Sequence, residues 1–165
     1  MRKTVKSMVD EATAAITTYS IEEARDLHGL DDVQFIDIRD VRELERDGVI
    51  PGAFHAPRGM LEFWACPDSP YHKPVFAQDK RFVLFCAAGW RSALATKTLQ
   101  DMGLPKVAHI DGGFGAWKAA APVTGRSIAG YRAVRDGDVH RSAGGDERDA
   151  GGKIGTIAGY RQAVP

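Results

Sequence analysis

The sequence contains little that could build a cross-linked, membrane-spanning or strongly charged protein. Its 165 residues include two cysteines, Cys66 and Cys86, which argues against a disulfide framework and predicts a reducing, cytoplasmic location. No apolar run approaches the length of a membrane span, and Asp10 and Glu11 interrupt the apolar core that a signal peptide would need. Lysine and arginine together number 22, as do aspartate and glutamate, so the net charge gives no reason to expect nucleic acid or a membrane as a partner.

Residues 124–165 lack most of the side chains that build a core. The segment holds nine of the 18 glycines and no Leu, Phe, Trp or Met, so it buries too little surface to offset its ordering entropy. We therefore predict a flexible, disordered tail over 124–165. The pentapeptide IAGYR occurs in it twice, at Ile128–Arg132 and Ile157–Arg161. Duplication is the simpler explanation, and a docking motif or an added sheet strand is the alternative.

Before this tail, residues 17–123 alternate between apolar runs and helix-forming segments, as expected for one α/β domain. The apolar runs predict strands at Val33–Ile38, within 50–57, at Arg81–Phe85 and at 106–110. Helices are predicted from Ser20, at 41–47, at 59–65, after Arg91 and at 113–122, with a further helical segment over residues 1–16. Strands separated by helices imply a central parallel sheet covered on both faces.

Local signals define two of these helices in more detail. Ser20 opens an S-x-x-E capping box, in which the two side chains bind backbone N–H groups of the first turn. Farther along, Ala95, Leu99 and Met102 recur at i, i+4 and i+7. This spacing predicts one apolar helix face, and Gly103 is expected to end that helix.

The most informative stretch is VLFCAAGWRSALATKTL, in which a buried strand ends on Cys86. Parallel sheets bind ligands beyond the carboxyl ends of their strands, and the following helix offers unpaired N–H groups and its positive dipole end. Both favour the thiolate of Cys86. Ala87, Ala88 and Gly89 are small enough for successive N–H groups to converge on one anion, and Arg91 adds a permanent positive charge. Together these features outweigh the alternative of a purely structural cysteine.

Four segments of the chain resemble the rhodanese family. CAAGWRS resembles the family's Cys-x4-Arg active-site loop, and FIDIRDVRE resembles its Asp-x-Arg-x-x-x-Glu segment. GVIPGAFHAPRG is similar to its Gly-His-Ile-Pro-Gly-Ala segment, with Val49 in place of the histidine, and HIDGGFGAWKAA is similar to its closing Gly-Gly-x-x-x-Trp helix. The four segments cover residues 17–122 in the family's order.

The resemblance implies a three-layer, rhodanese-like fold and a sulfurtransferase that works through a persulfide on Cys86. A donor such as thiosulfate would supply the sulfur, cyanide or a thiol would accept it, and no metal or organic cofactor is implied. Phosphatases on this fold use Cys-x5-Arg, because phosphate needs a wider cradle, whereas four residues separate Cys86 from Arg91. Ala87 stands where thiosulfate enzymes often carry Arg or Lys, so the donor stays open. A non-catalytic docking module and a carrier for a protein sulfur acceptor are the alternatives.

Further residues are expected around this loop. Substrate contacts are predicted for the loop residues and one arginine beyond it: Ala87, Ala88, Gly89, Trp90, Arg91 and Arg58. For Arg58 a solvated side chain is the alternative, and for Trp90 a packing role is as plausible as a place on the pocket rim. Asp37 and Arg39 are expected to support the site through ion pairs and hydrogen bonds rather than through catalysis.

The second cysteine and three histidines are the remaining candidates. Cys66 could resolve a persulfide or pair with Cys86, although a second cysteine more often does neither. His55, His72 and His109 are scattered without metal-ligand spacing, so no zinc site is predicted.

Overall fold

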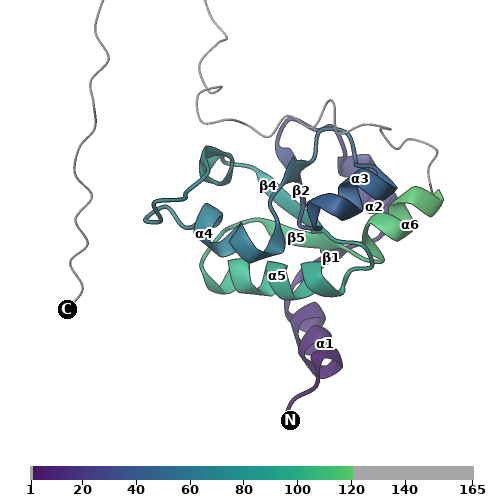
Figure 1. Cartoon of the computed structure of the whole chain (residues 1–165), viewed down its shortest axis with the longest axis horizontal. Helices are drawn as coiled ribbons and strands as arrows, with labels where there is room; N and C mark the ends of the chain where they lie inside the picture. Colours follow the sequence, from purple (N-terminus) through teal and green to yellow (C-terminus); the bar gives the residue numbers. More distant parts are fainter. Residues whose placement is uncertain (1, 121–165) are drawn as a thin grey trace, which may run out of the picture. The chain divides into compact units, whose positions relative to one another are not determined.

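The computed structural model describes residues 2–120, which form an alternating series of helices and strands (Figure 1). The strands are β1 (Thr17–Tyr19), β2 (Val33–Asp37), β3 (Phe54–His55), β4 (Arg81–Phe85) and β5 (Val107–Ile110). The α-helices are α1 (Val5–Ala15), α2 (Ile21–Leu27), α3 (Val41–Asp47), α4 (Leu61–Ala65), α5 (Trp90–Asp101) and α6 (Gly113–Ala120), with short 3-10 helices η1 (Arg58–Met60) and η2 (Pro74–Ala77). The predicted tail over 124–165, its repeated pentapeptide and the helix stop at Pro122 lie outside the described residues.

The five strands form one sheet in the order β1-β5-β4-β2-β3, and every pair is parallel. The register aligns Asp37 of β2 with Phe85 of β4, and Leu84 of β4 with His109 of β5. Because the strands are parallel, their carboxyl ends share one edge of the sheet. The predicted α/β class, a parallel sheet flanked by helices, is confirmed.

Two apolar clusters lie on opposite faces of this sheet, because successive side chains of a strand point to alternate faces. Within β4, Phe82 and Leu84 join the cluster that includes Leu99 of α5, whereas Val83 and Phe85 join the cluster formed with α2 and α6. Cys86 continues the even-numbered series and therefore lies on the α5 side. The alternation along β4 thus decides which helix faces the thiol.

The boundaries of helices α2 and α3 are set by capping residues. At α2, Ser20 and Glu23 form both hydrogen bonds of the predicted capping box, and at α3, Asp40 and Glu43 do the same. Helix α3 ends at Gly48, whose φ of 90° suits glycine. The second capping box matters for the site, because it places Glu43 in the first turn of α3.

Several details differ from the sequence prediction. Met102 lies beyond α5 and is 45% exposed, so it does not belong to the apolar face formed by Ala95 and Leu99. Helix α5 begins at Trp90, so the predicted loop is shorter and its last two residues are already helical. The three-residue edge strand β1 was not predicted, because so short a run carries no usable periodicity.

The N-terminal segment is helical, as predicted, over Val5–Ala15. Its Val9 and Ala12 pack with Ala93 of α5, so this helix covers the outer side of the helix that follows Cys86. None of the helices within residues 2–120 combines the length and the apolar character that crossing a lipid bilayer requires.

Candidate active site

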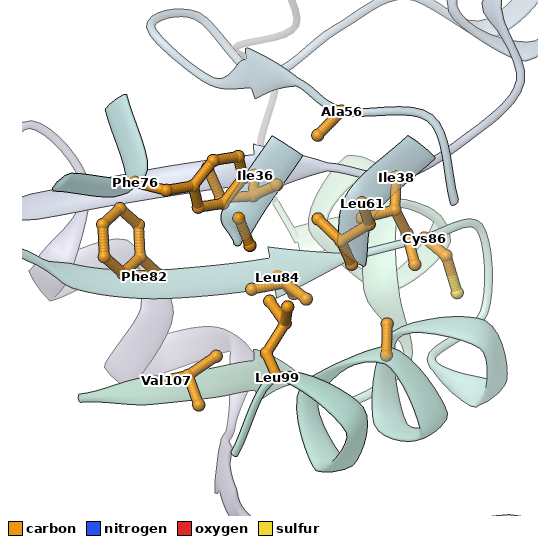
Figure 2. Packing of buried hydrophobic residues seen from close by; sticks show 12 residues of the cluster. Ile36, Ile38, Ala56, Leu61, Phe76, Phe82, Leu84, Cys86, Leu99 and Val107 are labelled. Atoms are coloured by element: carbon orange, nitrogen blue, oxygen red, sulfur yellow. The ribbon is translucent and has the colours of Figure 1, made fainter. Parts of the chain in front are cut away.

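Cys86 lies directly after β4, one of the inner strands of the sheet, and its sulfur is held within the following loop. The residue is 2% exposed. Its Sγ accepts a hydrogen bond from the backbone N–H of Gly89 at 3.2 Å and lies 3.6 Å from the hydroxyl of Ser92, which donates to it. Figure 2 shows the side chain where the β4 arrow ends, with its sulfur toward the first turn of α5. Two hydrogen-bond donors, the N–H of Gly89 and the hydroxyl of Ser92, are thus directed at the sulfur.

The loop can close on the sulfur because Gly89 adopts a left-handed conformation. Its φ is +94°, and a Cβ built there would lie 3.3 Å from the backbone nitrogen of Gly112. Gly89 is also the N-cap of α5 and offers no side-chain cap. The first N–H groups of α5, which include those of Trp90 and Arg91, therefore have no partner within the helix. They can bind an anion at the positive end of the helix dipole.

The carbonyl groups of the loop are bound from the opposite side by α6. The N–H of Phe114 donates to the carbonyl oxygen of Cys86 at 2.7 Å, and the N–H of Gly115 donates to that of Ala87 at 2.9 Å. This approach leaves no room at Gly113, where a Cβ would lie 2.4 Å from the carbonyl oxygen of Cys86. Gly113, the first residue of α6, thus lets the N-terminal turn of this helix brace the loop.

Arg91 forms a two-pronged ion pair with Glu43 of α3. Its two terminal nitrogens each lie 2.7 Å from a carboxylate oxygen. These bonds lower the pKa of Glu43 and raise that of Arg91, to which the neighbouring Cys86 also contributes. The pair joins the first turn of α5 to the first turn of α3, so Arg91 both places a positive charge beside the sulfur and ties the loop to another element.

This ion pair predicts a pH-dependent stability. Because the folded-state pKa of Glu43 is lowered, its stabilisation is present above the ordinary glutamate value of about 4.3 and is lost as the pH falls through the folded-state value. We expect Glu43→Gln to lose about 1 kcal/mol of unfolding free energy at pH 7, since part of the pair is exposed to solvent. The difference from the parent protein should shrink below about pH 4 in urea titrations.

The matched control is Glu45→Gln on the same helix, where the glutamate is exposed. It removes the same charge without touching Arg91, so its effect should be small at every pH. A Glu43→Gln difference that stays constant down to acid pH would contradict the ion-pair explanation.

A second ion pair is fully buried next to the site. The carboxylate of Asp37, at the end of β2, accepts hydrogen bonds from the side chain of Arg39 at 2.7 and 2.9 Å. Arg39 also donates to the carbonyl oxygen of Gly48, and its guanidinium lies 3.8 Å from the ring centroid of Phe114. The pair therefore connects β2 and the end of α3 to α6, the helix that braces the loop.

Comparison with known proteins identifies the family. Residues 20–120 match the rhodanese-like domain. The chain belongs to the rhodanese-like family. The match covers strands β2 to β5, the Cys86 loop and α6, in agreement with the sequence resemblance.

Solved structures agree with this rhodanese-like assignment. A protein of unknown function from Rhodopseudomonas palustris, described as a possible tyrosine phosphatase, is 56% identical over 76% of this chain and 96% of that one, with a TM-score of 0.74. A human single-domain sulfurtransferase is 26% identical over 63% of this chain and 96% of that one, with a TM-score of 0.53. A rhodanese-related protein from Thermoplasma volcanium, 21% identical over 67% of this chain and 99% of that one with a TM-score of 0.55, shares the fold.

The structure of the rhodanese-like domain also shows the surroundings of the other residues singled out in the sequence. Arg58 in η1 pairs with Glu62 one turn later, and its substrate contact stays a prediction. Trp90 is 53% exposed in the first turn of α5, which excludes a core position. Trp117 is buried. Cys66 caps the end of α4, and in residues 2–120 no three His, Cys, Asp or Glu side chains gather around a possible metal position.

The sequence analysis missed two buried polar residues behind the loop, Ser92 and His109. Ser92 follows Arg91 and so falls in the first turn of α5. The spacing of the histidines tests His109 only as a metal ligand. The usable signal is its place in the run VAHI, all of whose residues are buried, because a polar side chain inside a buried strand requires a hydrogen-bond partner.

Proposed function

We propose that this protein transfers sulfane sulfur through a persulfide on Cys86. In the first step, the thiolate attacks the outer sulfur of a donor such as thiosulfate. A new S–S bond forms at Sγ, and sulfite leaves with the electron pair of the broken bond. In the second step, cyanide or the thiolate of an acceptor attacks the outer sulfur of the persulfide, and Cys86 departs as a thiolate.

The observation that carries this proposal is the setting of the Cys86 sulfur in a small, amide-lined loop. The N–H of Gly89 already points at Sγ, and the free N–H groups at the start of α5 would hold the charged outer sulfur as an oxyanion hole holds oxygen. Ala87 and Ala88 have small side chains, and neither of them is buried. The thiolate is itself the nucleophile, so the proposed steps need no metal or organic cofactor.

The partners proposed for the site follow from the same chemistry. They are a small-molecule sulfur donor, for which Arg91 and Arg58 are the proposed charged contacts, and a thiol or cyanide acceptor. Transfer to a protein acceptor is the alternative, and neither nucleic acid nor a membrane is proposed. A reducing compartment such as the cytoplasm suits the reaction, because the acceptor thiol must be reduced.

Hydrolysis of phosphate esters is the second candidate, because the Rhodopseudomonas palustris relative is described as a possible tyrosine phosphatase. A cysteine phosphatase must surround three phosphate oxygens with N–H groups. Here only four residues separate Cys86 from Arg91. This smaller loop favours sulfur transfer.

One experiment compares the two candidates directly. Incubation with thiosulfate, mercaptopyruvate or glutathione persulfide should add the mass of one sulfur to the peptide that contains Cys86, measured by mass spectrometry before reduction. Added cyanide should remove that mass as thiocyanate, and p-nitrophenyl phosphate should give no product above background. An unmodified Cys86 with all three donors would overturn the proposal, and turnover of the phosphate ester would favour the phosphatase.

A further inference from the structure

Behind the candidate site, a chain of buried polar side chains runs from Cys86 away from the loop. The hydroxyl of Ser92 lies 3.6 Å from Cys86 Sγ and 3.3 Å from Nδ1 of His109. On the other side of the ring, Nε2 of His109 lies 3.1 Å from the hydroxyl of Thr18. The three residues come from α5, β5 and β1, so tertiary packing alone brings them together.

The inner members of this chain are shielded from water. Ser92 is fully buried and His109 is 2% exposed, whereas Thr18, on the edge strand β1, is partly exposed. Two buried polar side chains between α5 and β5 cost free energy unless they are hydrogen-bonded. The hydroxyl of Ser92 also donates to the carbonyl oxygen of Gly89 at 2.9 Å, so it holds the loop as well as facing the sulfur and the imidazole. The alignment of the two side chains with the reactive sulfur points to a role in its chemistry.

His109 is neutral at neutral pH, so it carries one ring proton. Burial lowers its pKa, and the carboxylate of Asp111 opposes this only in part. The groups that face the ring are the hydroxyls of Ser92 and Thr18, with the Cys86 sulfur beyond Ser92. A neutral imidazole donates from one nitrogen and accepts at the other, and a hydroxyl can do both. Either tautomer therefore satisfies the whole chain.

We propose that Ser92, His109 and Thr18 form a proton wire, which carries the proton of the Cys86 thiol to solvent. After the transfer, each hydrogen bond of the chain is donated in the direction of the sulfur anion. The S–H proton passes to Ser92, the Ser92 proton to Nδ1 of His109, and the Nε2 proton to Thr18. Thr18 releases its own proton to water, so one proton leaves and no residue in the chain gains charge. Ser92 now donates to the anionic sulfur, Nδ1–H donates to Ser92, and Thr18 donates to Nε2.

His109 is a positioning residue in this arrangement, because it acts on Cys86 through Ser92. The inference deepens the proposed function, since a thiolate and a persulfide at the same Sγ both need this donor. Its tests follow the Cys86 thiolate and the His109 ring without any sulfur donor. Failure of the wire and failure of sulfur transfer can therefore be distinguished.

The first test measures the pH at which iodoacetamide alkylation of Cys86 is half-maximal, in protein carrying Cys66→Ser. We expect His109→Phe and Ser92→Ala to raise this pH by about one unit, the worth of one hydrogen bond to an anion. His109→Asn should stay close to the parent, because its amide nitrogen takes the place of Nδ1 and can donate to Ser92. His109→Gln, which places its amide near Nε2, should behave like His109→Phe.

The matched control is Thr96→Val. Thr96 is a buried hydroxyl one turn beyond Ser92 on α5 that donates to the carbonyl oxygen of Ala108, so its removal disturbs the same packing without touching the wire. The alkylation profile should not move. An unchanged profile in His109→Phe, or an equal shift in Thr96→Val, would overturn the proposal.

The second test uses the protein without changes to the wire and so does not depend on the folding of the variants. Nitrogen-15 NMR of labelled protein reports which ring nitrogen of His109 carries the proton. The proton should move from Nε2 to Nδ1 over the pH range in which Cys86 becomes alkylatable, and it should not move in Cys86→Ser. A single tautomer across that range would overturn the wire even if sulfur transfer is confirmed.

Discussion

Cys86→Ser is expected to reduce sulfur transfer to the uncatalysed background, a loss on the order of 10⁴-fold or more. Serine can accept the Gly89 N–H in the same place, so the loop should keep its shape. A hydroxyl, however, is not ionised at neutral pH and cannot form the S–S bond on which the proposed reaction depends. The measurement is thiocyanate release with thiosulfate and cyanide, alongside the mass of the intact protein.

Cys66→Ser is the matched control for this experiment, because Cys66 caps α4 rather than lying in the amide-lined loop. It should keep transfer within about twofold of the parent protein and still gain one sulfur at Cys86. Comparable losses from both changes would instead assign Cys66 a part in resolving the persulfide.

Gly113→Ala should have the second-largest effect, through the brace between α6 and the loop. The φ of Gly113 is +57°, and its new Cβ would lie 2.4 Å from the carbonyl oxygen of Cys86 and 3.1 Å from the carbonyl carbon of Ala87. Both contacts are with backbone, which cannot rotate away. Backbone strain of about 1–2 kcal/mol and overpacking of about 1–3 kcal/mol together predict a loss of about 3 kcal/mol in unfolding free energy.

Activity should fall as well, because the displaced carbonyl of Cys86 moves the loop. A shift of about 1 Å at a reacting centre can cost about a hundredfold in rate. The control is Gly103→Ala, where φ is +89° but nothing lies within 4 Å of the new Cβ, so it adds strain without a clash. Equal effects of the two changes on melting temperature and rate would show that the brace is not the cause.

The elements of the fold were predictable where the signal is local. The strand Arg81–Phe85 is predicted by its apolar run, and the start of α2 by the capping box at Ser20, because both depend on neighbouring residues. Cys86 and the small residues after it could be recognised for the same reason. The exposure of Met102 could not, because helical spacing does not show where a helix ends.

The contacts around the loop were predictable only in part. Arg91 could be assigned a charge near the sulfur, but its partner Glu43 lies 48 positions away and is placed by the capping box of α3. The pairing of Ser92 with His109 depends on the register between β4 and β5 and on which face of the sheet α5 covers. Such contacts are products of tertiary packing, and no local pattern contains them.

The brace from α6 also has a consequence for protein engineering. The six residues from Cys86 to Arg91 take their shape from hydrogen bonds supplied by Phe114 and Gly115, more than 20 positions downstream. Grafting CAAGWR between a strand and a helix of another scaffold would transfer the thiol without the two N–H groups that bind the carbonyl oxygens of the loop. A functional transplant would also have to carry the segment DGGFG, with Gly112 and Gly113 in their left-handed conformations.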